Sequence, residues 1–591
     1  MRAVMTALVA GLAVGVAACG HPFAAQPRTG AAQATAPPVA TVAAPAIKVD
    51  QAGYLPGRPK VAMVVSAVAG DRFAVRRVRD GQIVFRGRLS APVADANSLD
   101  AVRAADFTAV EAPGRYALDV DGVGASWPFA IGDDAYARAY HLATRSFYGQ
   151  RCGTAVDLGP EFPGYAHEAC HRDNAYHAAS GKTGPKASGH KGWHDAGDYG
   201  RYVVNSGLST GTLLWAYEMF SGRAGNIRLD IPESGDGTPD ILNEIRWNLD
   251  WMLSMQDADG GVFHKQTSEQ FCPFVMPEQD RLTSFVIGTG QEPYKSSCAT
   301  ADFAAVMAAA ARIYRPFDPA FARTALDAAR RAHGWAEQHP AVLFTNPKGV
   351  GTGAYGDRDC SDELLWAVAE LWRTTGEDGF RQMFISRYAR HLGRIAATGP
   401  MSWGQVAPMA LWTYVLGGGT GDAAEAIRQA SVSAADAIVA RTAADGYRTS
   451  LARTDYIWGS NGVAANYGVQ LIVTNALAPN PRYLEAAADN LHYLLGRNTF
   501  SLSWVTQVGA NPFRHPHHRP SGADANAEPW PGLLAGGPNG RRQDPAMNGL
   551  PDLPPAKMYL DDQESYASNE VAINWNAPLV FLLASQLPAA R

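Results

Sequence analysis

Charge is scarce in this sequence. Asp, Glu, Lys and Arg make up 18% of the 591 residues, and 51 basic residues against 56 acidic ones leave a net charge of −5. The chain has no excess of basic residues to pair with phosphates, so a nucleic-acid partner is not expected. An apolar content of 47% excludes general disorder and is enough for a large core.

The N-terminal apolar run, residues 3–18, is too short and too rich in small residues to cross a bilayer comfortably, and it follows a short basic start. This pattern predicts a signal peptide over residues 1–18 and an exported protein. The run ends in Val-Ala-Ala-Cys-Gly, which is similar to a bacterial lipobox, so we expect a lipid on Cys19 as the only link to a membrane, at the outer membrane or cell surface. Cleavage near Ala18 without lipidation, giving a secreted or periplasmic protein, is the alternative. Residues 19–45, rich in Ala, Pro, Thr and Gln, predict a flexible tether.

Cysteine is scarce as well, with six in the chain. If Cys19 is lipidated, five remain, and an odd number argues against a framework made only of disulfides. Cys152, Cys170, His171 and His194 combine two thiols with two imidazoles, the ligand types of a tetrahedral structural zinc site. A Cys152–Cys170 disulfide is the alternative in an oxidising compartment.

The sequence changes character near residue 136. Residues 46–135 carry short alternating segments separated by turns, which predict a small β-sandwich. The strand candidates are Lys60–Val65, Arg72–Val75, Gln82–Phe85 and Arg115–Val120. From residue 136 to 591, apolar residues recur at helical spacing in roughly twelve segments, which indicates one large helical domain in the form of a toroid.

Two long loops rich in Gly and Pro interrupt the helical part, at 256–299 and 508–562. Loops of this length in a compact domain are usually functional. A disulfide between Cys272 and Cys298 could close the first loop, which would leave Cys360 as the odd thiol.

One acidic motif stands out at residues 192–203, Gly-Trp-His-Asp-Ala-Gly-Asp-Tyr-Gly-Arg-Tyr-Val. Asp195 and Asp198 lie three residues apart, with glycines between and beyond them, just before a helical run. Glycine permits a tight backbone that can aim both carboxylates into one cleft. Paired carboxylates suit the activation of water by a base. An Asp-rich turn that caps the following helix is the alternative.

Two further polar segments lie near the C-terminus. Glu570 precedes an apolar run, and a carboxyl at the mouth of such a run can be desolvated, which raises its pKa as a general acid requires. A glutamate favoured at a helix N-terminus is the alternative. The loop at 511–521, Asn-Pro-Phe-Arg-His-Pro-His-His-Arg-Pro-Ser, holds three His and two Arg. We expect it to donate hydrogen bonds to hydroxyls; its arginines disfavour a metal, and a solvated loop is the other alternative.

Taken together, these segments resemble glycoside hydrolase family 9, the inverting β-1,4-glucanases. The Asp-Ala-Gly-Asp motif, the His-Pro-His-His-Arg-Pro-Ser loop and the segment Ser-Tyr-Ala-Ser-Asn-Glu-Val-Ala-Ile-Asn-Trp-Asn occur in that family's order. Val-Asp-Gln-Ala-Gly-Tyr at 49–54 resembles the Ig-like domain of one bacterial subgroup. The resemblance implies a multidomain chain: an N-terminal Ig-like β-sandwich over 46–135, followed by an all-α (α/α)6 barrel catalytic domain over 136–591.

The resemblance also implies roles for individual residues. Asp198 is the expected general base, Asp195 helps to hold the water and keeps Asp198 ionised, and Glu570 is the expected general acid. In an inverting enzyme the acid and the base stand about 6.5–9.5 Å apart so that water fits between them. The residues expected to bind, stack on or border the sugar are His517, Arg519, Tyr355 and Tyr566. Trp458 fits a core position and a cleft position equally well.

Metals are implied by the same resemblance, but no organic cofactor. Related Ig-bearing enzymes carry zinc on residues of the same types as the four Cys and His above, where the ion would brace the catalytic loop. Two acidic loops resemble family calcium sites. Their expected ligands are Glu233, Asp236, Asp240, Asp359, Asp362 and Glu363. The second set departs from the family pattern, because Gly404-Gln405 stands where many relatives place an Asp; helix capping is the alternative for both loops.

The leading prediction is therefore a monomeric enzyme that hydrolyses β-1,4-glucosidic bonds in cellulose or mixed-linkage β-glucan with inversion. Exo action on cello- or chito-oligosaccharides is an alternative, because loops 256–299 and 521–556 could close one end of a cleft. A non-catalytic glycan-binding lipoprotein is the alternative from another class, which the presence of Asp198 and Glu570 disfavours. A metallohydrolase built on the histidines of the 511–521 loop is favoured least.

Overall fold

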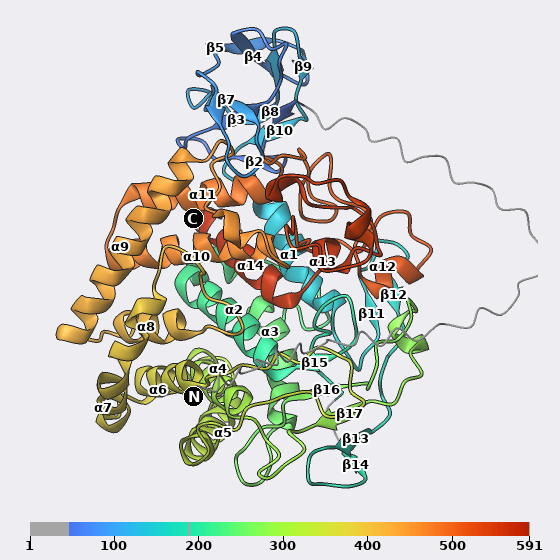
Figure 1. Ribbon diagram of the computed structural model, residues 1–591, viewed down its shortest axis with the longest axis vertical. Helices are drawn as coiled ribbons and strands as arrows, with labels where there is room; N and C mark the ends of the chain where they lie inside the picture. Colours follow the sequence, from blue (N-terminus) through green and yellow to red (C-terminus); the bar gives the residue numbers. More distant parts are fainter. Residues whose placement is uncertain (1–45, 187–189, 590–591) are drawn as a thin grey trace, which may run out of the picture. The chain divides into compact units, whose positions relative to one another are not determined.

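The computed structural model describes residues 46–186 and 190–589. The predicted signal peptide, the lipid attachment site at Cys19 and the tether lie outside the described residues. Within them, no helix is both long and apolar enough to cross a membrane. The described part begins with ten strands, coloured blue in Figure 1, and continues with a region that is mostly helical.

The first ten strands form two sheets. Their bounds are β1 Ile47–Lys48, β2 Gly53–Tyr54, β3 Val61–Val64, β4 Arg72–Arg77, β5 Ile83–Arg88, β6 Val93–Ala94, β7 Ala101–Asp106, β8 Gly114–Val120, β9 Gly124–Ala125 and β10 Phe129–Ile131. The sheet orders are β1-β3-β7-β6 and β2-β10-β8-β4-β5, with β9 paired to β8. Alternate residues of β8 are buried, and Leu118 joins Phe107 and Phe129 in a core that draws on both sheets. The predicted β-sandwich is confirmed, and the expected strands appear as β3, β4, β5 and β8.

Twelve of the described helices form two rings. The inner helices contact one another in the closed order α2, α4, α6, α8, α10, α14 and back to α2. Their bounds are α2 Val203–Ala224, α4 Ser297–Ile313, α6 Ser361–Thr375, α8 Ala407–Leu416, α10 Ser460–Leu477 and α14 Ile573–Gln586. The outer helices that pack on them are α1 Ala137–Gly149, α3 Asp240–Ser254, α5 Pro319–Gln338, α7 Asp378–Arg387, α9 Asp422–Ala444 and α11 Pro481–Leu494. This arrangement is the predicted (α/α)6 barrel (Figure 1).

The two rings differ in how their helices are buried. In α4, an inner helix, every residue except Arg312 is buried. The outer helix α5 instead buries one face, with Phe321, Ala325 and Ala328 at helical spacing. Its N-terminus is capped by Asp318, whose carboxylate accepts the Phe321 N–H at 2.9 Å. Apolar periodicity is therefore clear in α5 and weak in α4.

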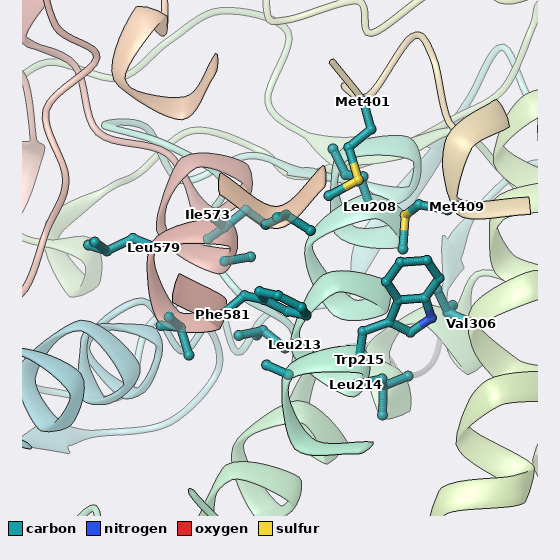
Figure 2. Close-up of a cluster of buried hydrophobic side chains, with 14 of the residues drawn as sticks. Leu208, Leu213, Leu214, Trp215, Val306, Met401, Met409, Ile573, Leu579 and Phe581 are labelled. Atoms are coloured by element: carbon teal, nitrogen blue, oxygen red, sulfur yellow. The ribbon is translucent and has the colours of Figure 1, made fainter. Parts of the chain in front are cut away.

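The centre of the barrel is filled with apolar side chains. Figure 2 shows Trp215 of α2 beside Met409 of α8, with Val306 of α4 close by and Phe581 of α14 directed toward α2; all are buried. A centre filled in this way is packed closely, as protein interiors are. The polar residues that could act on a substrate therefore come from helix ends and connecting loops.

Short elements connect the barrel helices. A five-stranded sheet has the order β14-β13-β17-β16-β15, and β11 pairs with β12. The bounds of these strands are β11 Val156–Asp157, β12 Ala166–His167, β13 Ala175–Ala178, β14 Pro185–Lys186, β15 Arg201–Tyr202, β16 Lys265–Thr267 and β17 Phe285–Ile287. The short helices are η1 Pro277–Gln279, η2 Tyr388–Arg394, η3 Arg453–Asp455, α12 Arg519–Ala523, η4 Ala546–Gly549, η5 Pro555–Lys557 and α13 Tyr566–Asn569. Both long loops predicted from the sequence thus contain local structure.

The disulfide pairing differs from the expectation. Cys298 in the first turn of α4 is bonded to Cys360, which precedes α6, and their Cα atoms are 4.7 Å apart. Cys272 is a free thiol, so the expected Cys272–Cys298 bond is wrong. Because α4 and α6 are neighbours in the inner ring, they bring together two cysteines separated by 62 residues. Cys152 and Cys170 are also free, so the alternative disulfide between them is wrong too.

The motif at 49–54 lies where the β-sandwich contacts the barrel. Asp50 Oδ2 is 2.8 Å from Nδ1 of His492 in α11. The side-chain oxygen of Gln51 accepts the backbone N–H groups of Ala510 and Asn511 at 3.0 and 2.7 Å. Gln51 therefore fixes the start of the histidine-rich loop of the barrel.

Candidate active site

Backbone hydrogen bonds bring the polar segments together. The Arg519 N–H donates to the Gly197 carbonyl at 3.1 Å, and the His517 N–H donates to the Asn569 carbonyl at 2.9 Å. Gly197 has to be glycine, because a Cβ there would lie 2.0 Å from the His517 carbonyl oxygen. The Asp-Ala-Gly-Asp turn, the histidine-rich loop and the segment before Glu570 are thus joined at one place.

Asp195 is fully buried, and both of its carboxylate oxygens accept hydrogen bonds. Asn205 Nδ2 donates to Oδ1 at 2.7 Å, and Tyr355 Oη donates to Oδ2 at 2.5 Å. Burial and the facing Asp198 carboxylate raise the pKa of Asp195 to about 8, although the two hydrogen bonds oppose the rise. A proton held by this pair therefore favours Asp195.

Asp198 presents one free oxygen to the site. Its Oδ2 accepts the Gly200 N–H at 2.9 Å and the Tyr202 hydroxyl at 3.2 Å. The other oxygen accepts no hydrogen bond from residues 46–186 and 190–589. That oxygen can take a proton from a water molecule.

Glu570 follows α13 and is half-buried. The indole Nε1 of Trp458 donates to its Oε2 at 3.2 Å. Burial, together with the nearby carboxylates Asp198 and Asp195, raises the pKa of Glu570 well above its usual range. The raised pKa favours the protonated form of Glu570, which suits a proton donor. Trp458 is 38% exposed, so it belongs to the site and not to the core.

His517 and Arg519 are both fixed by backbone carbonyls. His517 donates Nδ1–H to the Gln563 carbonyl at 2.7 Å, and burial lowers its pKa, which keeps the ring neutral with Nε2 as an acceptor. Arg519 donates Nε–H to the Cys272 carbonyl at 2.9 Å and Nη1–H to the Gly197 carbonyl at 2.7 Å. Arg519 forms no ion pair with any described residue, and its charge acts to lower the pKa of Glu570.

The two expected tyrosines have different surroundings. The ring centroid of Tyr566 is 5.4 Å from that of Trp458 and 5.8 Å from that of His517, so Tyr566 borders the acid. Tyr355 has a left-handed backbone with φ of 45°, which is unusual for a bulky residue. Its hydroxyl is engaged by Asp195, a contact that the sequence interpretation did not include. A sugar-stacking role for Tyr355 stays a prediction.

Sequence reasoning missed two residues that hold the carboxylates. Asn205 lies in the first turn of α2 and is fully buried. Tyr202 ends β15 and donates to Asp198. The signal available for Asn205 is an amide side chain among helix residues that are all buried. A buried polar group needs a hydrogen-bond partner, so such an amide is expected to contact another polar group.

The histidines of the 511–521 loop form no group of three potential metal ligands within the described residues. The carbonyl of His515 accepts from Asn569 Nδ2 at 2.5 Å. His518 is buried, with Nδ1 2.8 Å from Ser521 Oγ and Nε2 3.1 Å from Gln150 Oε1. These separate partners give the metallohydrolase alternative no support.

A second polar centre adjoins the aspartate turn. The ligand atoms of Cys152, Cys170, His171 and His194 all lie within 4.8 Å of one another, and no other group of three or more His, Cys, Asp or Glu in the described ranges does so. Cys170 Sγ is 3.8 Å from His194 Nε2, close to the separation of about 3.6 Å between two ligands of tetrahedral zinc. Burial opposes ionisation of Cys152, but a hydrogen bond from Cys170 and nearby positive charge lower its pKa well below the usual range. These four residues fit a structural zinc ion.

The orientation of His171 also fits a metal ligand. Its Nε2 is 3.3 Å from Asp280 Oδ2, whereas its buried Nδ1 has no partner. A histidine that ligates a metal through one nitrogen usually has the other nitrogen held by a carboxylate or carbonyl. His194 is adjacent to Asp195, so an ion at this centre would stiffen the aspartate turn.

The first predicted calcium loop uses its acidic groups in other contacts. Glu233 pairs with Arg151 through two contacts of 2.9 and 3.0 Å. Asp236 accepts the Thr238 N–H at 2.8 Å. Asp240 accepts the Leu229 N–H at 2.7 Å. The structure does not bring the three carboxylates together, and calcium at this loop stays a prediction.

In the second predicted calcium loop, only some of the acidic groups have protein partners. Asp359 pairs with Arg390 at 3.1 Å, and Asp362 accepts backbone N–H groups at the start of α8. Glu363 is fully buried, and neither of its oxygens has a partner among the described residues. Asp302 of α4, which the sequence analysis did not name, is in the same condition. Burial and the neighbouring carboxylates raise the pKa of both groups, so this cluster favours a proton or a cation.

Known proteins share this fold and these sequence features. Residues 136–583 match the family described as Glycosyl hydrolase family 9, and residues 42–125 match the Cellulase N-terminal ig-like domain. Endoglucanase D of Acetivibrio thermocellus is 37% identical over 543 residues, which are 91% of this chain and 83% of that protein. The xyloglucan-specific endo-beta-1,4-glucanase BoGH9A of Bacteroides ovatus is 35% identical over 583 residues, which are 94% of this chain and 96% of that protein.

A solved structure of a GH family 9 enzyme also superposes on this chain. The zinc-binding triple mutant of the GH family 9 endoglucanase J30 superposes with a TM-score of 0.85 at 37% identity, covering 90% of this chain and 100% of that one. A helical barrel that gathers three carboxylates at one site is the framework of a glycoside hydrolase. The chain belongs to glycosyl hydrolase family 9 and carries an Ig-like domain ahead of its catalytic domain.

Proposed function

We propose that the chain is an endo-acting β-1,4-glucanase that cleaves cellulose-type or mixed-linkage β-glucan with inversion. The observation that carries the proposal is the pairing of Asp198, which has a free oxygen, with Glu570, whose pKa is raised, in a frame fixed by backbone hydrogen bonds. The name of the Bacteroides ovatus relative, an endo-beta-1,4-glucanase, supports a β-1,4-linked main chain as substrate. Xyloglucan is a second candidate polymer, because the Bacteroides ovatus relative is specific for it.

In the proposed reaction, Asp198 accepts a proton from water as the water oxygen attacks the anomeric carbon. Glu570 gives its proton to the glycosidic oxygen, and the leaving sugar departs as an alcohol. Asp195 favours the ionised form of Asp198 because it is the better proton carrier of the pair. His517, through Nε2, and Arg519 orient the sugar beside the scissile bond.

The test follows viscosity and new reducing ends together on soluble mixed-linkage β-glucan and on xyloglucan, with residues 20–591 expressed. An early collapse of viscosity, with Asp198→Asn and Glu570→Gln each at least about 100-fold slower, is the expected result. Reducing ends that rise while viscosity holds would establish exo action. Binding of glucan without any cleavage would instead favour the non-catalytic glycan-binding alternative.

We also propose a structural zinc ion at Cys152, Cys170, His171 and His194. The ion supplies no chemistry to the reaction; the four residues hold the aspartate turn in place. Purified protein should contain one zinc per chain by plasma mass spectrometry, and Cys170→Ser should lose it together with thermal stability. Zinc content that is unchanged in Cys170→Ser would show that the site is elsewhere.

A calcium ion near Glu363 and Asp302 is a further proposal. What supports it is that each buried carboxylate lacks a partner among the described residues. Calcium should raise the unfolding temperature of the wild type by a few degrees and leave Glu363→Gln unaffected. Equal responses in both proteins would exclude this site.

The domain limits and the export route are proposals as well. They are a signal peptide over 1–18, a tether over 19–45, an Ig-like domain over 46–135 and a catalytic domain over 136–591, with a lipid on Cys19 and a monomeric mature protein. Fractionation of cells that express the wild type and Cys19→Ser tests the anchor, because only the variant should leave the membrane fraction. Sedimentation of the mature protein tests the oligomeric state.

A further inference from the structure

Lys265 is a buried cation beside the proposed base. It begins β16, lies opposite Tyr202 of β15 in the antiparallel register, and is 0% exposed. No carboxylate among the described residues forms an ion pair with it. Its Nζ donates instead to neutral acceptors, Asn346 Oδ1 at 2.8 Å, the Gly353 carbonyl at 2.7 Å and Thr352 Oγ1 at 3.1 Å. Burying an ammonium without a counter-charge costs free energy, so a neutral side chain at this position would give a more stable fold. The presence of lysine therefore indicates that the charge serves the function of the protein.

The acceptors of Lys265 belong to the segment that delivers Tyr355. They lie at 346–353, immediately before Tyr355, whose hydroxyl donates to Asp195 Oδ2 at 2.5 Å. His264 supports the same segment, since its Nε2 is 2.7 Å from the Ala354 carbonyl and its ring stacks on Phe344 at 3.6 Å. The left-handed backbone of Tyr355 needs such support, because a bulky residue does not adopt it freely.

The charge of Lys265 also acts on the catalytic carboxylates. Its Nζ is 5.6 Å from the ring centroid of Tyr202, whose hydroxyl donates to Asp198 Oδ2. Burial lowers the pKa of Lys265 to about 7, and the field of Asp198 opposes that fall, so the two groups are electrostatically coupled. Burial also lowers the pKa of His264 to about 3, which leaves it uncharged. The other charged or titratable groups that act on this region include Asp195, Glu570, Arg519, Tyr202 and Tyr355.

We propose that Lys265 is a positioning residue: it holds segment 346–355 so that Tyr355 reaches Asp195, and it supplies the positive charge that keeps Asp198 ionised. The inference rests on the proposed roles of Asp195 and Asp198. Lys265 would thus have two effects, one on the shape of the segment and one on the charge of the base, and substitutions can separate them.

The test is the pH profile of kcat and kcat/KM for Lys265→Met and Asn346→Leu. Lys265→Met should lower kcat about tenfold to hundredfold. It should also move the acid limb of kcat/KM upward by about half a pH unit or more, because loss of a positive charge raises the pKa of the base. Asn346→Leu removes one acceptor and keeps the ammonium, so it should lower kcat and leave the acid limb in place.

Lys60 provides the matched control. It is a fully buried lysine of the β-sandwich whose Nζ donates to the Arg58 carbonyl at 2.8 Å. Lys60→Met should lower the unfolding temperature without moving the pH profile. If Lys265→Met gives the same result as Lys60→Met, Lys265 is merely structural and the inference is wrong.

Asp198→Asn distinguishes failure of this inference from failure of the proposed function. Full activity in Asp198→Asn would remove the assigned base, and with it the proposed function. An inactive Asp198→Asn beside an unchanged Lys265→Met would overturn only the role of Lys265. If Lys265→Met does not fold, as judged by circular dichroism, a double-mutant cycle of Asn346→Leu with Tyr355→Phe takes its place. The two effects on kcat should be strongly non-additive, and additive effects would overturn the proposal.

Discussion

At the scale of single residues, the hydrogen bond from Trp458 to Glu570 lowers the pH at which the proposed acid loses its proton. The bond favours the ionised carboxylate and so lowers the pKa of Glu570, against the larger upward effects of burial and of Asp198. Trp458→Phe removes the donor, so the pKa of Glu570 should rise further. The basic limb of kcat/KM should therefore move to higher pH by about half a unit to one unit. A pH–rate profile on soluble β-glucan measures the shift.

Tyr566→Phe is the control for that substitution. Its ring packs on Trp458, but its hydroxyl donates no hydrogen bond to Glu570. The basic limb should stay where it is in the wild type. A limb that moves downward in Trp458→Phe, or equally in both variants, would show that Trp458 does not tune the acid.

The contiguous motifs made the carboxylates predictable from the sequence. Asp195 and Asp198 share one short turn, and Glu570 stands at the entrance to an apolar helix, so the local pattern carried the information. Asn205 and Lys265 were not predictable in the same way. Each lies within a regular element, and only the packing of distant segments shows that its polar group faces Asp195 or the segment before Tyr355.

At the scale of elements, the Cys298–Cys360 bond ties α4 to the start of α6. The bond closes a loop of 62 residues, for which loop-closure entropy gives a stabilisation of up to about 4 kcal/mol. Replacing both cysteines by serine should lower the unfolding temperature measured by calorimetry under oxidising conditions. Adding a reductant should lower the wild type to the level of the variant and leave the variant unchanged.

Cys272→Ser is a second test of the Cys298–Cys360 pairing. Because Cys272 is a free thiol, its replacement should change the unfolding temperature much less than the loss of the Cys298–Cys360 pair. A large loss in Cys272→Ser, together with peptide mapping that finds Cys272 oxidised, would contradict the pairing seen in the structure.

The helix pattern explains why the barrel was easier to foresee than its disulfide. Helical spacing of apolar residues gave a count of roughly twelve segments, and the outer helix α5, which buries one face, shows the spacing clearly. The inner helix α4 is buried at every residue except Arg312, so its apolar pattern does not indicate which neighbour each face contacts. The order of the inner helices around the ring determines which of them are neighbours. The partner of Cys298 follows from that order, because α4 lies beside α6.

At the scale of the whole molecule, a buried cluster joins the β-sandwich to the barrel. Asp50 Oδ1 accepts the N–H groups of Ala52 and Gly53 at 2.9 and 3.1 Å, and Oδ2 contacts His492 of α11 at 2.8 Å. Burial raises the pKa of Asp50 to about 8 and lowers that of His492 well below its usual value. The pair is thus held without net charge, with one proton between the carboxyl and the imidazole.

This cluster makes the stability of the protein depend on pH. Asp50 keeps its proton in the folded protein up to a pH of about 8, whereas the unfolded chain loses it near the ordinary pKa of 3.8. Between these values the folded state binds more protons, so the free energy of unfolding falls as pH rises, by about 1.4 kcal/mol per pH unit for one such group. Asp50→Asn cannot ionise, and its amide can donate to His492. Its unfolding temperature should therefore fall less between pH 5 and pH 8 than that of the wild type, whereas Asp133→Asn, at an exposed position, should follow the wild type. Equal slopes in Asp50→Asn and the wild type would show that Asp50 is ionised in the folded protein, and the contact between the domains would then be a charged pair.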